Sequence, residues 1–221
     1  MQENYKNYFK NTYKSTFATK DTSTQSKFLY KQYLIIKNKI NIGERKGGAV
    51  LEIGSGLGAF AKILLDNSFG NYTGIELDKK AVEFTNSTIG DYFENISLEM
   101  FNEKSKKKYK TIFAFEVLEH LYNPQDGIKQ IKDLLDEDGI FIGTSPFPFK
   151  KNVLADKTHR FCLHPENWKK FFLENGFKKV EIYPMSFIPF VWRINKHLNI
   201  RLPFYISIKH FISTTLIIAK K

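Results

Sequence analysis

This sequence of 221 residues contains little cysteine and arginine and no long apolar run. Its one cysteine, Cys162, excludes an intramolecular disulfide and is typical of a protein from a reducing cytoplasm. No apolar run approaches the roughly 18 residues of a membrane-spanning helix, so we expect no such helix. The first residues are polar and lack the apolar core of a secretory signal, which also indicates a cytoplasmic location.

Acidic residues are outnumbered too, since 34 Lys and Arg residues against 23 Asp and Glu residues give a net charge of +11. A charge of this size attracts nucleic acid or an anionic membrane surface. Nearly all of it is lysine, however, whereas specific phosphate recognition favours the planar fork of arginine. We therefore interpret the charge as a lysine-rich composition and keep nucleic acid as the alternative partner.

What the sequence does contain is a glycine-rich turn between an apolar strand and a helix. Residues 49–53 (A-V-L-E-I) are a β-prone run, and apolar residues recur at helical spacing from Phe60 onwards. Glycine allows positive φ and close approach of a ligand to the backbone, and the start of a helix leaves N–H groups free. Glu52, just before the glycines, disfavours a pyrophosphate there and suits a cationic ligand.

The pattern E-x-G-x-G-x-G that begins at Glu52 resembles motif I of the class I S-adenosylmethionine (SAM)-dependent methyltransferases. The resemblance implies that Gly54, Ser55, Gly56 and Gly58 lie against the amino-acid end of SAM, and that S-adenosylhomocysteine is the product. Taken alone, the motif also fits a structural strand-to-helix turn in another α/β protein.

A second acidic residue, Glu76, ends the next predicted strand, residues 72–75, one βαβ unit further along. A carboxylate at this place can accept hydrogen bonds from both hydroxyls of a ribose. Glu76, Leu77 and Asp78 together resemble the post-I motif of the same family, which adds Leu77 to the predicted SAM contacts. We expect Asp78 to cap the helix of residues 79–85. A surface carboxylate at a strand end is the alternative for Glu76.

Alternating apolar residues predict a third strand near residues 95–100. The loop after this strand should face the adenine of SAM, which makes Phe101 and Asn102 candidates for stacking and hydrogen bonding. The charged run at residues 104–110 is predicted to be a solvated loop.

A fourth apolar strand, residues 111–115, leads into the hexapeptide E-V-L-E-H-L, which begins at Glu116. The hexapeptide resembles the E-V-L-E-H-[LV] motif of the ubiquinone-type O-methyltransferases and their relatives. One departure is Lys110, where that family usually has aspartate. Glu116 is predicted to contact SAM, and a helical turn would place Glu116, Glu119 and His120 on one side, beside the methyl group.

Methyl transfer to an oxygen also requires that the acceptor loses its proton or that its anion is stabilised. In one reading, His120 or His159 is a general base. In another, Glu116, Glu119, His120 and His159 bind a divalent cation such as Mg²⁺, as similar ligand sets do in ubiquinone-type and small-RNA methyltransferases. In a third, Glu119 and His120 only cap a strand–helix junction. Arg160 is predicted to pair with a phosphate or carboxylate of the acceptor, or to form a surface ion pair.

The remaining pattern completes an α/β, Rossmann-like doubly wound sheet. The resemblance implies seven strands in the order 3-2-1-4-5-7-6, the last antiparallel, with SAM at the carboxyl ends of strands one, two and four. Two helices and three strands are predicted in this part: a helix from Pro124 to Asp138, a strand at 139–146, a helix at 165–175 and strands at 180–183 and 215–219.

We predict a single domain, with an N-terminal arm or helical cap at 1–47, a core at 48–183 and 212–221, and an insert at 184–211. Aromatic and basic residues in the insert suit a lid, a homodimer interface or peripheral contact with an anionic membrane. The predicted function is SAM-dependent methylation of an oxygen on a small molecule, such as a sugar, a nucleotide-linked intermediate or a phenol. The alternatives are metal-dependent RNA 2′-O-methylation and a non-catalytic SAM-binding subunit.

Overall fold

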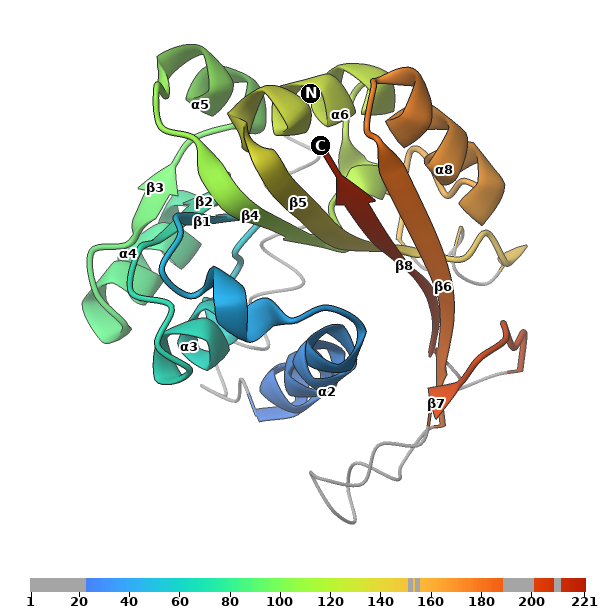
Figure 1. Ribbon diagram of the computed structural model, residues 1–221. Coiled ribbons are helices and arrows are strands. Elements are labelled where there is room, and N and C mark those ends of the chain that lie inside the picture. The colour runs from blue at the N-terminus through green and yellow to red at the C-terminus, as the bar shows by residue number, and fades with distance from the viewer. Residues whose placement is uncertain (1–22, 151–152, 154–155, 189–200, 209–211) are drawn as a thin grey trace.

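The computed structural model describes residues 23–150, 153, 156–188, 201–208 and 212–221 (Figure 1). Predictions for the arm at 1–22 and for much of the 184–211 insert lie outside these residues. Among the described residues, no helix combines the length and hydropathy needed to cross a bilayer.

One mixed sheet organises the molecule, in the order β3-β2-β1-β4-β5-β8-β6-β7. The strands β3, β2, β1, β4 and β5 are parallel to one another, whereas β8 is antiparallel to both β5 and β6. With β8 as the seventh predicted strand, the predicted order and the antiparallel last strand are confirmed. The strands are β1 Val50–Ile53, β2 Tyr72–Glu76, β3 Phe93–Asn95, β4 Tyr109–Phe115, β5 Leu135–Pro146, β6 Lys179–Phe187, β7 Arg201–Leu202 and β8 Ile212–Lys220.

Helices cover both faces of the sheet (Figure 1). On one face lie α5 Leu98–Lys104, α6 Pro124–Leu134 and α8 Pro165–Glu174, and on the other lie α2 Ser23–Lys39, α3 Ala59–Asp66 and α4 Lys79–Thr88. Two short 3₁₀ turns, η1 Ile42–Arg45 and η2 Leu118–His120, precede β1 and follow β4. Three layers of this kind bury both faces of the parallel strands.

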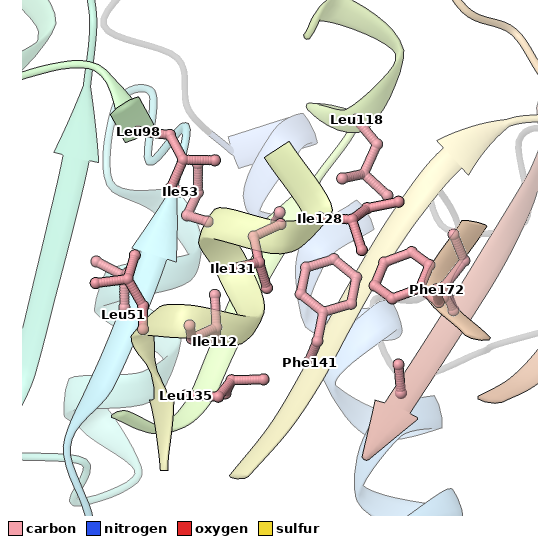
Figure 2. Packing of buried hydrophobic residues seen from close by; sticks show 14 of the residues in the cluster. Leu51, Ile53, Leu98, Ile112, Leu118, Ile128, Ile131, Leu135, Phe141 and Phe172 are labelled. Carbon is pink, nitrogen blue, oxygen red and sulfur yellow. The ribbon is translucent and has the colours of Figure 1, made fainter. Parts of the chain in front are cut away.

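Each face has its own apolar core. Figure 2 shows Ile128 and Ile131 of α6 beside Phe141 of β5, and the rings of Phe141 and Phe172 lie 5.0 Å apart. On the opposite face, Phe60 of α3 packs edge-on against Phe113 at 5.0 Å. Burial of rings of this size is a major source of stability in such a sheet.

Local capping chemistry explains where several helices begin and end. Asp78 accepts a hydrogen bond from the backbone N–H of Ala81, as predicted, and Asn123 caps α6 with Pro124 as its first residue. The backbone after α8 turns at Gly176, whose φ is 80°. These stops depend on a few neighbouring residues, so the sequence indicates them well.

Two boundaries differ from the prediction. The predicted third strand at 95–100 is wrong, because β3 is Phe93–Asn95 and Ser97 caps α5 by accepting a hydrogen bond from Met100 N–H. The alternating apolar residues belong to a helix in which Leu98 and Phe101 face the core. The helix predicted to run to Asp138 ends at Leu134, and β5 begins four residues earlier than expected.

The sheet also extends further than the sequence indicated. The strands β6 and β8 are both 9 residues long and pair from end to end. Part of the insert contributes β7, which pairs with the end of β6 at Phe187 and was not predicted. β4 likewise begins at Tyr109, within the run predicted to be a solvated loop, and Tyr109 is 1% exposed.

Candidate functional site

The glycine turn after β1 has the backbone that its sequence demands. Gly54, Gly56 and Gly58 have φ values of 69°, 53° and 72°, in the left-handed region where glycine costs least. A Cβ on Gly54 would lie 2.5 Å from Cγ2 of Val117. The bare backbone of Gly54 is therefore what lets the turn pack against the segment after β4, which contains the E-V-L-E-H-L motif.

Glu52 lies in β1, just before this turn, and is 4% exposed. Its Oε2 accepts a hydrogen bond of 2.6 Å from the hydroxyl of Tyr72 in β2. Burial raises the pKa of Glu52 to about 8, although the Tyr72 hydrogen bond opposes the shift. The charge of nearby Glu76 raises this pKa further, so the two predicted carboxylates lie close together.

Glu76, at the end of β2, is 5% exposed and links the glycine turn to β2 through hydrogen bonds. Oε2 accepts a hydrogen bond of 2.9 Å from Gly56 N–H. Oε1 accepts two more, from Leu77 N–H at 2.7 Å and Asp78 N–H at 3.0 Å. Burial raises the pKa of Glu76, and these three backbone donors oppose the rise.

Two other residues predicted to bind SAM lie beside these carboxylates. Leu77 is 54% exposed, an unusual exposure for a leucine next to a buried strand end. Ser55 is 6% exposed, and its hydroxyl has no hydrogen-bond partner within the part of the chain that the structure describes. An exposed apolar side chain and an unpartnered buried hydroxyl both suit contact with a ligand.

The structure corrects the predicted adenine contacts. Phe101 packs in the core, where it is 5% exposed and its ring lies 6.2 Å from that of Tyr109, so its ring is engaged by the protein and does not lie at the loop position that we predicted. Asn102 lies on α5 next to it and not in a loop after β3. The polar residue at the tip of β3 is Asn95, whose side chain donates hydrogen bonds to the carbonyls of Glu76 and Leu77. Sequence reasoning missed Asn95 because it placed the strand too late.

Glu116 follows β4 with a positive φ of 55°, an uncommon backbone for glutamate. Its Oε1 accepts a hydrogen bond of 2.8 Å from the hydroxyl of Thr214, in β8. Thr214 Oγ1 also lies 2.8 Å from the carbonyl oxygen of Ser145 in β5, and its single hydrogen can be donated to only one of these two acceptors at a time. Burial raises the pKa of Glu116, which this hydroxyl partly offsets. No sequence pattern pointed to Thr214, because β8 is far away along the chain.

Glu119, His120 and His159 come together in a tight group. One carboxylate oxygen and one ring nitrogen from each histidine all lie within 4.8 Å of one another. Nε2 of His120 is 3.9 Å from Oε1 of Glu119. Glu116, predicted to belong to the same ligand set, is not a member of this group. We refer to these three residues as the Glu–His–His centre.

The carboxylate of Glu119 has an unusual environment. It is 0% exposed, and neither oxygen makes a hydrogen bond of good geometry among the described residues, although the hydroxyl of Ser145 is near enough to oppose the rise of its pKa. Burial, and after it the charge of Glu116, raises the pKa of Glu119 well above its ordinary value. Burial and the neighbouring His159 lower the pKa of His120. Both pKa shifts favour the neutral forms of these two side chains.

His159 reaches this centre because the loop after β5 is fastened to η2. The backbone N–H groups of Arg160 and Phe161 both donate to the carbonyl of Glu119, at 2.9 and 3.1 Å. The rings of His120 and His159 are 4.9 Å apart. The guanidinium of Arg160 lies 5.4 Å from the ring centre of Tyr122, which is 69% exposed, so Arg160 stacks on the surface beside the centre.

The glycine turn, Glu76 and the segment with the Glu–His–His centre thus follow the carboxyl ends of β1, β2 and β4, three adjacent parallel strands. Ligands of open α/β sheets bind at this edge, where the strand order reverses. The strand order and this edge define a Rossmann-like fold of the kind found in SAM-dependent methyltransferases.

The chain belongs to the methyltransferase domain family, whose model matches residues 29–182. Solved structures of the same fold include a SAM-dependent methyltransferase from Thermotoga maritima, described as a possible histamine N-methyltransferase, with a TM-score of 0.67, 17% identity and coverage of 100% of both chains. Magnesium protoporphyrin IX methyltransferase from Synechocystis PCC 6803, solved with bound SAM, has a TM-score of 0.57 and 17% identity over 88% of this chain and 81% of its own.

A curated relative is sphingolipid C9-methyltransferase 2 of Gibberella zeae, 29% identical over 109 residues. The match covers 45% of this chain and only 21% of that protein. The chain is therefore a member of a methyltransferase family, and its fold is the one seen in solved SAM-dependent methyltransferases.

Proposed function

We propose that this protein transfers the methyl group of SAM to an oxygen of a small-molecule acceptor, and that the Glu–His–His centre receives the acceptor hydroxyl. The observation that carries the proposal is the carboxylate of Glu119, which is fully buried and makes no hydrogen bond of good geometry among the described residues. Burying such a group costs free energy unless a ligand completes its contacts. His120 and His159 beside it supply the groups that can take a proton.

The cofactor end of the site supports the same arrangement. We assign the ribose of SAM to Glu76 and its amino-acid end to the turn with Gly54, Gly56 and Gly58, with Ser55 and Leu77 in contact. Glu52, with its pKa near 8, would take its charged form beside the ammonium of SAM. Glu116 would lie nearest the methyl group, its carboxylate held by Thr214.

The sulfonium of SAM already activates the methyl group, so the protein has to align donor and acceptor and deprotonate the hydroxyl. In the proposed step the acceptor oxygen bonds to the methyl carbon as the methyl–sulfur bond breaks, and S-adenosylhomocysteine leaves. The hydroxyl proton passes to His120 Nε2 or to His159. Sugars, nucleotide-linked intermediates and phenols all have such a hydroxyl, and Arg160 would pair with an anionic group on them.

The same centre has the donor set of a divalent-cation site. Glu119, His120 and His159 would be the ligands, and the cation would lower the pKa of the acceptor hydroxyl. Two imidazole nitrogens with one carboxylate suit Mn²⁺, Fe²⁺ or Zn²⁺ better than the Mg²⁺ of our sequence prediction, since Mg²⁺ prefers oxygen ligands.

SAM with a ¹³C-labelled methyl group tests the function. The protein is incubated with phenols, sugar nucleotides and a short RNA, and the product methyl group is identified by its ¹³C chemical shift. An O-methyl signal from a small molecule supports the proposal, whereas methylation of only nitrogen, carbon or RNA contradicts it. Repeating the assay in excess EDTA, then with Mn²⁺ or Mg²⁺ restored, tests the cation; full activity in EDTA excludes it.

Carbon is the second candidate acceptor. The partial match to sphingolipid C9-methyltransferase 2 favours it, because that name describes methylation at a carbon. The ¹³C experiment separates the two, since a methyl carbon bonded to oxygen resonates far from one bonded to carbon.

A further inference from the structure

We propose that Thr158 and Asp156 are positioning residues that hold His120 in one tautomer, with a lone pair and not an N–H on the Nε2 that faces Glu119. The tautomer is a statement about the resting protein, while its use in methyl transfer rests on the proposed function. No motif in the sequence singled out either residue.

Asp156 determines what the hydroxyl of Thr158 can do. Oδ1 of Asp156 accepts a hydrogen bond of 2.8 Å from Thr158 N–H and another of 2.7 Å from the Thr158 hydroxyl. A hydroxyl has a single hydrogen to donate. That hydrogen is directed to the carboxylate, so toward any other neighbour Thr158 Oγ1 is an acceptor.

The other neighbour is His120. Nδ1 of His120 lies 3.0 Å from Thr158 Oγ1 and 3.3 Å from the carbonyl oxygen of Thr158. A carbonyl oxygen can only accept, and the hydroxyl oxygen is restricted to accepting by Asp156. Both contacts therefore require that Nδ1 carries the hydrogen, because a lone pair on Nδ1 would face two other lone pairs.

A neutral imidazole has only one N–H, so hydrogen on Nδ1 leaves a lone pair on Nε2. Nε2 faces Oε1 of Glu119 at 3.9 Å, beyond hydrogen-bond distance. The lone pair of Nε2 thus lies on the side of the ring that faces Glu119, in the form that can take up a proton or bind a cation. The opposite tautomer would present an N–H there and could do neither.

The same loop supplies both the second histidine and the positioning hydroxyl. Thr158 and His159 are consecutive, and the N–H groups of Arg160 and Phe161 anchor the loop to the carbonyl of Glu119. Docking of this loop on η2 therefore brings His159 to the centre and sets the tautomer of His120 in one step.

Long-range ¹H–¹⁵N spectra of histidine-labelled protein test the tautomer without any acceptor. We expect the resting protein to show His120 with its hydrogen on Nδ1, assigned by comparison with His120→Gln. In Asp156→Ala the Thr158 hydroxyl is free to donate, so a population with hydrogen on Nε2 should appear. Hydrogen on Nε2 in the unsubstituted protein would overturn the proposal, whatever the enzyme methylates.

Steady-state kinetics with the acceptor found in the ¹³C experiment test whether Thr158 positions His120 for methyl transfer. Thr158→Val keeps the shape but removes the hydroxyl, and Thr158→Ser restores it. We expect Thr158→Val to lower kcat about tenfold or more, the usual effect of losing a partner that orients a site histidine. KM for SAM should stay unchanged, and Thr158→Ser should recover most of the loss. Equal kcat in both variants, with both folded by thermal melting, would remove the positioning role.

Discussion

The hydroxyl of Tyr72 donates a hydrogen bond of 2.6 Å to Oε2 of Glu52 across the β1–β2 pair. Both side chains are buried, and burial raises the pKa of Glu52 to about 8. Below this pH the carboxyl is mainly neutral in the protein without ligand. A cationic ligand beside Glu52 would favour its charged form, so the Tyr72–Glu52 pair would link the core of the sheet to the proposed SAM site.

This pKa predicts how stability depends on pH. The unfolded glutamate titrates near 4.5, so between pH 4.5 and about 8 the folded protein binds more protons than the unfolded chain. The contribution of Glu52 to stability is complete below pH 4.5 and is lost as the pH rises toward 8, by up to about 1.4 kcal/mol per pH unit. Urea unfolding from pH 5 to 8 measures it. Glu52→Gln is the control, and equal slopes in the two proteins would contradict the prediction.

Gly74 makes room for the same pair. A Cβ there would lie 2.8 Å from the Tyr72 hydroxyl oxygen and 2.6 Å from Cδ1 of Phe93. Gly74→Ala should therefore lower the free energy of unfolding by about 1–3 kcal/mol, as overpacking of a core does. Gly70→Ala is the matched control, since nothing lies within 4 Å of its Cβ position. Similar urea midpoints for the two variants would contradict this prediction and show that β2 shifts to accommodate the added methyl group.

Glu76→Ala should weaken SAM binding. The substitution removes a carboxylate at the end of β2 that accepts three backbone hydrogen bonds and is assigned to the ribose. We expect a loss of about 1–3 kcal/mol in binding free energy, the cost of losing a charged hydrogen-bond partner. Isothermal titration with SAM measures it, with Glu94→Ala on the exposed side of β3 as control. Unchanged affinity would remove Glu76 from the cofactor site.

Glu119→Met should separate stability from activity. An apolar side chain of similar length relieves the burial of a carboxylate that makes no hydrogen bond of good geometry within the described chain, so thermal stability should rise by about 1–3 kcal/mol. Methyl transfer should be lost, because the centre no longer has an acidic group. Glu99→Met, on the exposed side of α5, should change neither property. A less stable Glu119→Met protein would indicate that the carboxylate has a structural role.

The sequence by itself determined the features that depend on neighbouring residues. The turn of Gly54, Gly56 and Gly58, the cap at Asp78 and the break at Gly176 follow from backbone geometry and from hydrogen bonds a few residues long. Apolar periodicity was enough for β1, β2, β4 and most helices. The order of the strands followed from a resemblance that rests on three short acidic motifs.

Only the tertiary structure decided which residues meet from distant parts of the chain. The Thr214–Glu116 hydrogen bond, the Tyr72–Glu52 pair and the loop that brings His159 to Glu119 link different strands and loops. The sequence placed the third strand too late because Leu98 and Phe101 fit either a strand or a short helix, and packing against the core selects the helix. Contacts of this kind have no signature in local sequence, since their partners become neighbours only when the sheet forms.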